Sequence, residues 1–91
     1  MKGYINKRVL ISGGSKGIGR ALAVQLASAG AHVVVTARGQ AALDETVEAM
    51  RGCAAADRVL DSISMDVTDS EAVAKGCAEA IERLEADLKA L

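Results

Sequence analysis

The segment 11–20 reads ISGGSKGIGR and holds most of the chemical information in this chain. Its glycines are spaced Gly13-x-x-x-Gly17-x-Gly19 and lie between a strand-like and a helix-like stretch. Glycines let the backbone turn tightly and let an anion approach the peptide amides. The start of a helix after such a loop favours a phosphate. The segment therefore predicts a phosphate-binding loop, and its position argues against the alternative of a glycine-rich turn without a ligand.

Two common nucleotide motifs are excluded by single residues. A triphosphate-binding loop requires Gly-x-x-x-x-Gly-Lys-Ser/Thr. Counted from Gly14, the second glycine is Gly19, but Arg20 and Ala21 follow it, so the hydroxyl that would hold magnesium is absent. The spacing Gly-x-Gly-x-x-Gly would need a glycine where Leu22 stands. The loop thus differs from both patterns.

Apolar residues alternate between strand-like and helix-like spacing along the chain. Short apolar runs at 9–11, 32–36 and 59–65 predict three strands. Three stretches with helical spacing alternate with these strands. The first contains Ile18, Leu22 and Leu26 and stops at Gly30, and the second contains Leu43, Val47 and Met50 and ends near Gly52. The third follows a capping box that begins at Thr68, and it continues to the last residue. This βαβαβα order predicts an α/β fold with a three-stranded parallel sheet, ordered 3-2-1, with two helices on one face and the third on the other. The apolar strands indicate burial on both faces.

Length and composition are those of one small globular domain. The chain has 91 residues, of which 51% are hydrophobic and 25% charged, and this balance argues against disorder. The longest apolar run, Val33–Val35, is too short to cross a bilayer, and residues 1–8 do not resemble a leader. Two isolated cysteines and the single His32 provide no metal site, and His32 is expected to be structural. We expect a cytoplasmic protein with free thiols.

Charges are sorted along the chain. Residues 1–43 contain six basic and no acidic residues, whereas residues 44–91 contain five basic and twelve acidic ones. Chance and ordinary solvated helix faces are one explanation, and an anion-binding first half is the other. Nucleic acid is not an expected partner, because Tyr4 is the only aromatic residue and the net charge is −1.

The glycine loop resembles that of the short-chain dehydrogenase/reductase family, which reads Thr-Gly-x-x-x-Gly-Ile-Gly. Only Ser12 departs from this pattern, and it keeps the hydroxyl. The resemblance implies an oxidoreductase of carbonyl substrates and a single, partial Rossmann-like dinucleotide-binding domain over residues 1–91, a truncated βαβαβα unit. The cofactor-binding residues that it implies in the loop are Gly13, Ser15, Lys16, Gly17, Ile18 and Gly19.

The end of the second strand bears on the type of cofactor. The strand ends Thr36-Ala37-Arg38, without the carboxylate that would bind the ribose 2′-hydroxyl of NAD. Arg38 and Lys16 can instead pair with a 2′-phosphate, which favours NADP(H), although both could be plain surface charges. Asp66-Val67 match the Asp-Val that the family places beside the adenine, and Asp66 could also serve only as a helix cap.

A narrower resemblance is to the 3-ketodihydrosphingosine reductase branch, through residues 13–17, 36–38 and 64–67. The chain departs from that branch at Ala42, and 3-oxoacyl-carrier-protein reductases share much of the pattern. Membership of the branch would suggest the cytosolic face of the endoplasmic reticulum.

The family's catalytic Ser and Tyr-x-x-x-Lys pair are not found in residues 1–91. We therefore expect no catalytic residue in this chain and a carbonyl substrate only for a full-length relative. A non-catalytic cofactor-binding or interaction module is the alternative. A first strand at the sheet edge would also favour self-association.

Overall fold

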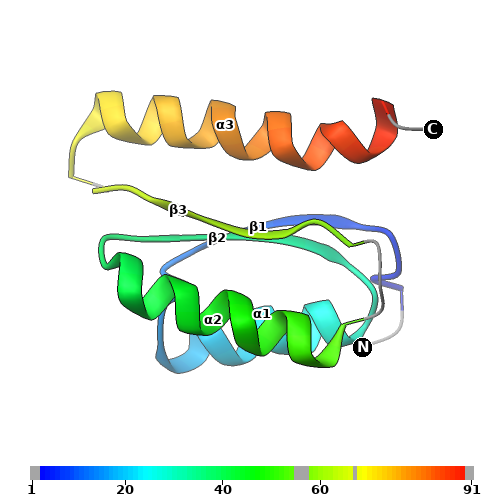
Figure 1. Cartoon of the computed structure of the whole chain (residues 1–91). Helices are drawn as coiled ribbons and strands as arrows, with labels where there is room; N and C mark the ends of the chain where they lie inside the picture. The colour runs from blue at the N-terminus through cyan, green and yellow to red at the C-terminus, as the bar shows by residue number, and fades with distance from the viewer. Residues whose placement is uncertain (1–2, 55–57, 67, 90–91) are drawn as a thin grey trace.

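In the part of the chain that the structure describes, three strands and three helices alternate and form three layers (Figure 1). The computed structural model describes residues 3–54, 58–66 and 68–89. The elements are β1 (Arg8–Ser12), α1 (Gly17–Ser28), β2 (His32–Ala37), α2 (Gln40–Cys53), β3 (Leu60–Ser64) and α3 (Ser70–Lys89). Helices α1 and α2 lie along one face of the sheet and α3 lies along the other (Figure 1). The βαβαβα order predicted from the sequence is confirmed.

The sheet is parallel, with β2 between β1 and β3, so the predicted strand order is confirmed. Leu10 of β1 pairs with Val34, and Val34 pairs in turn with Asp61 of β3. The apolar side chains of β2 are buried on both faces, because this central strand lies beneath helices on either side.

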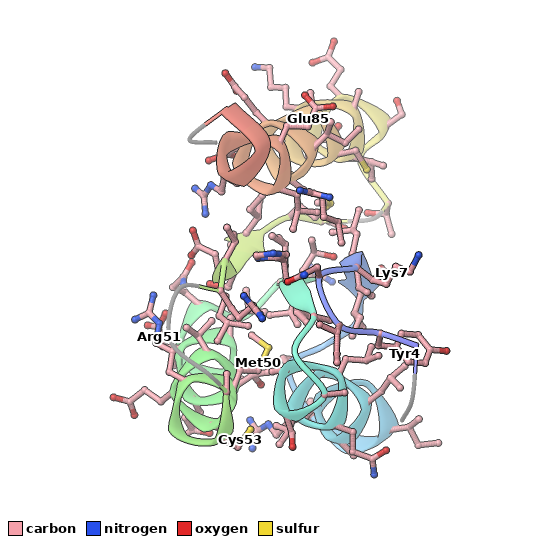
Figure 2. All side chains as sticks on the ribbon, turned by 90° about the vertical axis from the view of Figure 1, so that its right-hand side faces the viewer. Tyr4, Lys7, Met50, Arg51, Cys53 and Glu85 are labelled. Carbon is pink, nitrogen blue, oxygen red and sulfur yellow. The ribbon has the colours of Figure 1, made fainter. Side chains whose placement is uncertain are left out.

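The core on one face lies between β2 and the two helices α1 and α2. Met50 of α2 points into this layer (Figure 2). Helix α1 packs through Ala23, Leu26 and Ala27. Of the stripe predicted from the sequence only Leu26 is buried, whereas Ile18 is 88% exposed and Leu22 is also exposed. The reason is that α1 contacts both the sheet and α2, and small residues allow this close approach while turning the larger ones outward.

The core on the other face lies under α3. Its buried residues are Val34, Ile63, Met65, Ala80 and Leu84. Leu10 lies on this face because it pairs with Val34, yet it is 40% exposed, and Ile81 of α3 is exposed as well. Burial on both faces, predicted for all strands, is therefore wrong for β1. Helix α3 packs mainly over β2 and β3, and Arg8 of β1 reaches it through a hydrogen bond from its Nε to the Leu84 carbonyl at 3.0 Å, so Leu10 is left partly uncovered.

The helix ends follow local capping chemistry. Gly30, with φ +93°, follows the end of α1 as predicted, whereas α2 runs one residue beyond Gly52. The Asp69 carboxylate begins α3 by accepting hydrogen bonds from the N–H groups of residues 71 and 72, at 3.0 and 3.3 Å. The predicted cap, Thr68, is wrong because its hydroxyl donates to Asp66 instead.

His32 begins β2 and is buried, as expected of a structural residue. Its Nδ1 accepts the N–H of Val59 at 3.0 Å, which joins β2 to the start of β3. Cys53 and Cys77 are both free thiols. Among the described residues, no helix has the length and apolarity needed to cross a membrane.

Candidate functional site

The glycine loop connects β1 to α1 at the carboxyl edge of the sheet. The N–H groups of Gly13 and Gly14 both donate to the Thr36 carbonyl, at 2.7 and 3.2 Å. These two bonds hold the loop against the end of β2. The loop therefore lies beside the turn that carries Arg38.

Two glycines of this loop are required by close packing. A Cβ on Gly19 would lie 2.2 Å from the carbonyl oxygen of Gly13, so the first turn of α1 can approach the loop only without a side chain. A Cβ on Gly14 would lie 2.6 Å from the Cβ of Val35. Gly14 was not among the predicted site residues, since the Gly-x-x-x-Gly-x-Gly spacing does not include it. Its role is to seat the loop on β2.

The surroundings of the loop fit an anion. A Cβ on Gly13 or on Gly17 would meet nothing within 4 Å, so this space is open to a ligand that approaches the backbone. Lys16 stands at the N-cap of α1 in an extended conformation and makes no side-chain cap, and the first turn holds no acidic residue. The first N–H groups of a helix have no partner within the helix and carry a partial positive charge. A phosphate group fits this arrangement.

Arg38 and Asp66 form the second part of the site. They follow the ends of the adjacent strands β2 and β3, and Arg38 Nη2 lies 3.7 Å from Asp66 Oδ2. The Arg38 side chain is 76% exposed and remains accessible to a ligand. The Thr68 hydroxyl and backbone N–H donate to Asp66 Oδ1 at 2.7 and 2.9 Å. These bonds, with a smaller contribution from Arg38, hold the pKa of Asp66 below its ordinary value of 3.8.

The remaining predicted residues differ in their surroundings. Ser15 is buried, whereas Lys16, Gly17 and Ile18 are exposed at the start of α1. Val67 lies outside the described residues.

Sequence reasoning missed two residues that contact the loop, Arg20 and Thr46. Arg20 Nη2 donates to the Ser15 carbonyl at 2.6 Å, and Arg20 Nε donates to the Thr46 hydroxyl at 3.0 Å. Thr46 is fully buried on the apolar stripe of α2. A hydroxyl within a stripe that is otherwise apolar was the available signal.

Comparison with known proteins identifies the class to which this fold and loop belong. The sequence model of the family described as short chain dehydrogenase matches residues 7–91. The chain belongs to the short-chain dehydrogenase/reductase family, whose members bind a nicotinamide dinucleotide cofactor.

Individual relatives share the fold and part of the sequence. The chain is 38% identical over 78 residues to a 3-ketodihydrosphingosine reductase of Aspergillus fumigatus, and the match covers 84% of this chain and 21% of that protein. It is 39% identical over 70 residues to the L-xylulose reductase of Mesocricetus auratus, covering 77% of this chain and 26% of that protein. The solved structure of NAD⁺-bound xylitol dehydrogenase superposes with a TM-score of 0.83 at 25% identity, covering 91% of this chain and 31% of that one. The chain therefore spans between a fifth and a third of the length of these relatives.

Proposed function

We propose that this chain, as a single partial Rossmann domain over residues 1–91, is the NADP(H)-binding part of an oxidoreductase that reduces a carbonyl substrate. The observation that carries the choice of cofactor is Arg38, an exposed cation directly after β2 at the edge where the glycine loop lies. No acidic residue occupies the end of β2 itself, the position from which a carboxylate would bind the ribose 2′-hydroxyl and repel a 2′-phosphate. The Asp66 carboxylate partly neutralises Arg38, but at 3.7 Å and in contact with solvent this pairing is weak enough for a phosphate to compete.

Each part of the site has one binding task in this proposal. The loop residues Gly13 and Gly17 and the start of α1 accept the pyrophosphate. Lys16 and Arg38 pair with the 2′-phosphate, and a guanidinium can do so through two parallel hydrogen bonds. Ser15, Ile18, Gly19, Asp66 and Val67 complete the cofactor-binding set, with Asp66 beside the adenine. The bound cofactor supplies the hydride.

Calorimetry with NADPH and NADH tests this assignment. We expect the chain to bind NADPH more tightly, and Arg38→Asp to lose that preference by about tenfold or more, since a charge-assisted contact is replaced by a repulsion. Lys75→Asp makes the same change of charge on α3 and serves as the matched control, which should retain the preference. An NADPH-to-NADH affinity ratio that is unchanged in Arg38→Asp would show that Arg38 is only a surface charge and does not select the cofactor.

We further propose that residues 1–91 alone reduce no carbonyl compound. The resemblance implies a Tyr-x-x-x-Lys pair as the general acid/base, and Tyr4 is followed at the corresponding spacing by Arg8. Substrate-dependent oxidation of NADPH by the 91-residue chain, followed by absorbance, would contradict this. A 3-ketosphingoid base is the first substrate to test in a longer protein that contains this sequence, on the strength of the match to the Aspergillus enzyme. Such a substrate would fit a cytoplasmic protein at the face of the endoplasmic reticulum.

A second candidate function is that of an interaction module, and the edge of β1 favours it. Among the described residues, β1 pairs with a strand on one side only, and its Leu10 is 40% exposed on the face of the sheet that carries α3. An apolar strand edge of this kind invites pairing with another chain. We propose self-association through this edge, which sedimentation can detect.

A further inference from the structure

Arg20 is the centre of a hydrogen-bonded cluster behind the glycine loop. It stands on the first turn of α1, and its Nη2 donates to the Ser15 carbonyl at 2.6 Å. The same nitrogen lies 3.2 Å from Glu45 Oε2 and 3.4 Å from the Ala42 carbonyl of α2. Its Nε donates to the hydroxyl of Thr46 at 3.0 Å. One guanidinium therefore connects the loop to α2.

The Ser15 carbonyl is the point at which this cluster acts on the loop. The Thr46 hydroxyl oxygen also lies 3.4 Å from the Ser15 carbonyl oxygen. It lies 3.2 Å from the Ala42 carbonyl oxygen, so these two carbonyls compete for the single hydroxyl proton of Thr46. The described peptide bonds are trans, so the N–H of Lys16 points opposite to the Ser15 carbonyl. A carbonyl held toward α2 thus turns the Lys16 amide away from α2. The cluster fixes the orientation of the peptide that leads into Lys16.

The other end of the cluster fixes the start of α2. Arg38 follows β2, and α2 begins at Gln40, two residues later. The groups that Arg20 contacts, from Ala42 to Thr46, belong to the first two turns of this helix. Thr46 is fully buried, so a missing partner for its hydroxyl is costly, whereas the contact between Arg20 and Glu45 lies at the surface. The loop that carries Lys16 and the turn that carries Arg38 are thereby held together through one side chain.

We propose that Arg20 and Thr46 are positioning residues that set the placement of Lys16 relative to Arg38, and with it the discrimination between cofactors with and without a 2′-phosphate. The inference rests on the proposed NADP(H)-binding function. Neither residue needs to touch the cofactor. Arg20 is already engaged by three carbonyl or hydroxyl oxygens and one carboxylate, and Thr46 is buried beneath it.

Substitutions at Thr46 and Arg20 separate positioning from plain stability. Thr46→Val keeps the shape and removes the hydroxyl, whereas Thr46→Ser keeps the hydroxyl and serves as its matched control. Arg20→Gln removes the positive charge and the several N–H donors of the planar guanidinium. Arg51→Gln makes the same replacement at the end of α2 remote from the loop, the end that faces the viewer in Figure 2. Calorimetry with NADPH and NADH gives the affinity ratio, and thermal melts monitored by circular dichroism give the stability of each variant.

We expect Thr46→Val and Arg20→Gln to weaken NADPH binding by about tenfold, the equivalent of one charge-assisted hydrogen bond, and NADH binding by less than about threefold. Thr46→Ser and Arg51→Gln should keep the affinity ratio of the unmodified chain. If Arg20→Gln does not fold, Arg20→Lys retains the charge without the planar guanidinium, and its NADPH-to-NADH affinity ratio is compared with that of the unmodified chain instead.

The possible failures are distinguishable. An unmodified chain without preference for NADPH contradicts the proposed function itself. An unmodified chain that prefers NADPH, together with variants that keep its ratio, overturns the positioning role alone. Equal losses for both cofactors also overturn it, because they would show that the cluster maintains the loop without affecting discrimination.

Discussion

Replacing Gly19 by alanine tests whether close packing of the loop against α1 builds the site. The new Cβ would lie 2.2 Å from the Gly13 carbonyl oxygen and 3.0 Å from its carbonyl carbon. Carbon and oxygen atoms that are not bonded approach to about 3.3 Å at the closest, so the loop and the helix must separate by about 1 Å. The loop cannot retreat freely, because the Gly13 N–H is bonded to the Thr36 carbonyl at 2.7 Å. We expect the substitution to displace the loop and to disturb phosphate binding.

Two opposing contributions decide the magnitude. Alanine in place of glycine near the start of a helix contributes up to about 1 kcal/mol of stability. Forcing a methyl group into a packed position costs about 1–3 kcal/mol. Since the neighbouring atoms are backbone and not a flexible side chain, the upper part of that range applies, and the net loss is about 1–2 kcal/mol. For a domain of this size each kcal/mol lowers the Tm by about 4–8 °C.

The assay compares Gly19→Ala with Gly52→Ala. A Cβ on Gly52 would meet nothing within 4 Å, and Gly52 lies in the last turn of α2, so this control should be as stable as the unmodified chain or more so by up to about 1 kcal/mol. Thermal melts and calorimetric titration with NADPH are measured on both. A Gly19→Ala chain that melts at the original temperature and binds NADPH with the original affinity would refute the packing argument.

Two further predictions concern the strand edge and the response to acid. Leu10→Lys should shift the chain toward monomer in sedimentation velocity, because a charge on an exposed strand opposes edge-to-edge pairing, whereas an unaltered distribution would exclude that edge as the interface. The pKa of Asp66 is lower in the folded chain than its ordinary 3.8, so its contribution to stability is full above pH 3.8 and is lost as the pH falls through the folded value. The Asp66→Asn variant should therefore lose less Tm between neutral pH and about pH 3 than the unmodified chain does. Equal losses of Tm would show that Thr68 does not stabilise the ionised carboxylate.

The order of the elements was predictable because their signals are local. Strand β2 has a continuous apolar run, and Gly30 supplies the positive φ that follows α1, so neither depends on distant contacts. The face of α1 was not predictable in the same way. Ile18 and Leu22 have helical spacing with Leu26, but the choice between that stripe and the one through Ala23 depends on where α2 lies. Tertiary packing, and not periodicity, decides which stripe is buried.

The candidate site was likewise predictable only where its residues are marked by local sequence. The glycine spacing and the residue at the end of β2 are features of the chain itself, and they led directly to the loop and to Arg38. The cluster of Arg20 and Thr46 joins residues that are 26 positions apart, and only the packing of α1 against α2 brings them into contact. The proximity of Arg38 to Asp66 likewise depends on the parallel pairing of β2 with β3.

The carbonyl of Thr36 has a consequence for the kinetics of cofactor binding. Because it accepts the N–H groups of both Gly13 and Gly14, the first half of the loop is tied to the sheet before any ligand arrives. Amide hydrogens in such bonds exchange with solvent at the rate at which the sheet opens, and not at the rate of an open loop. A dinucleotide then meets a surface that is already ordered and loses little affinity to the ordering of the chain. Its association should be limited by encounter and orientation, with a rate constant that depends weakly on temperature and steeply on ionic strength.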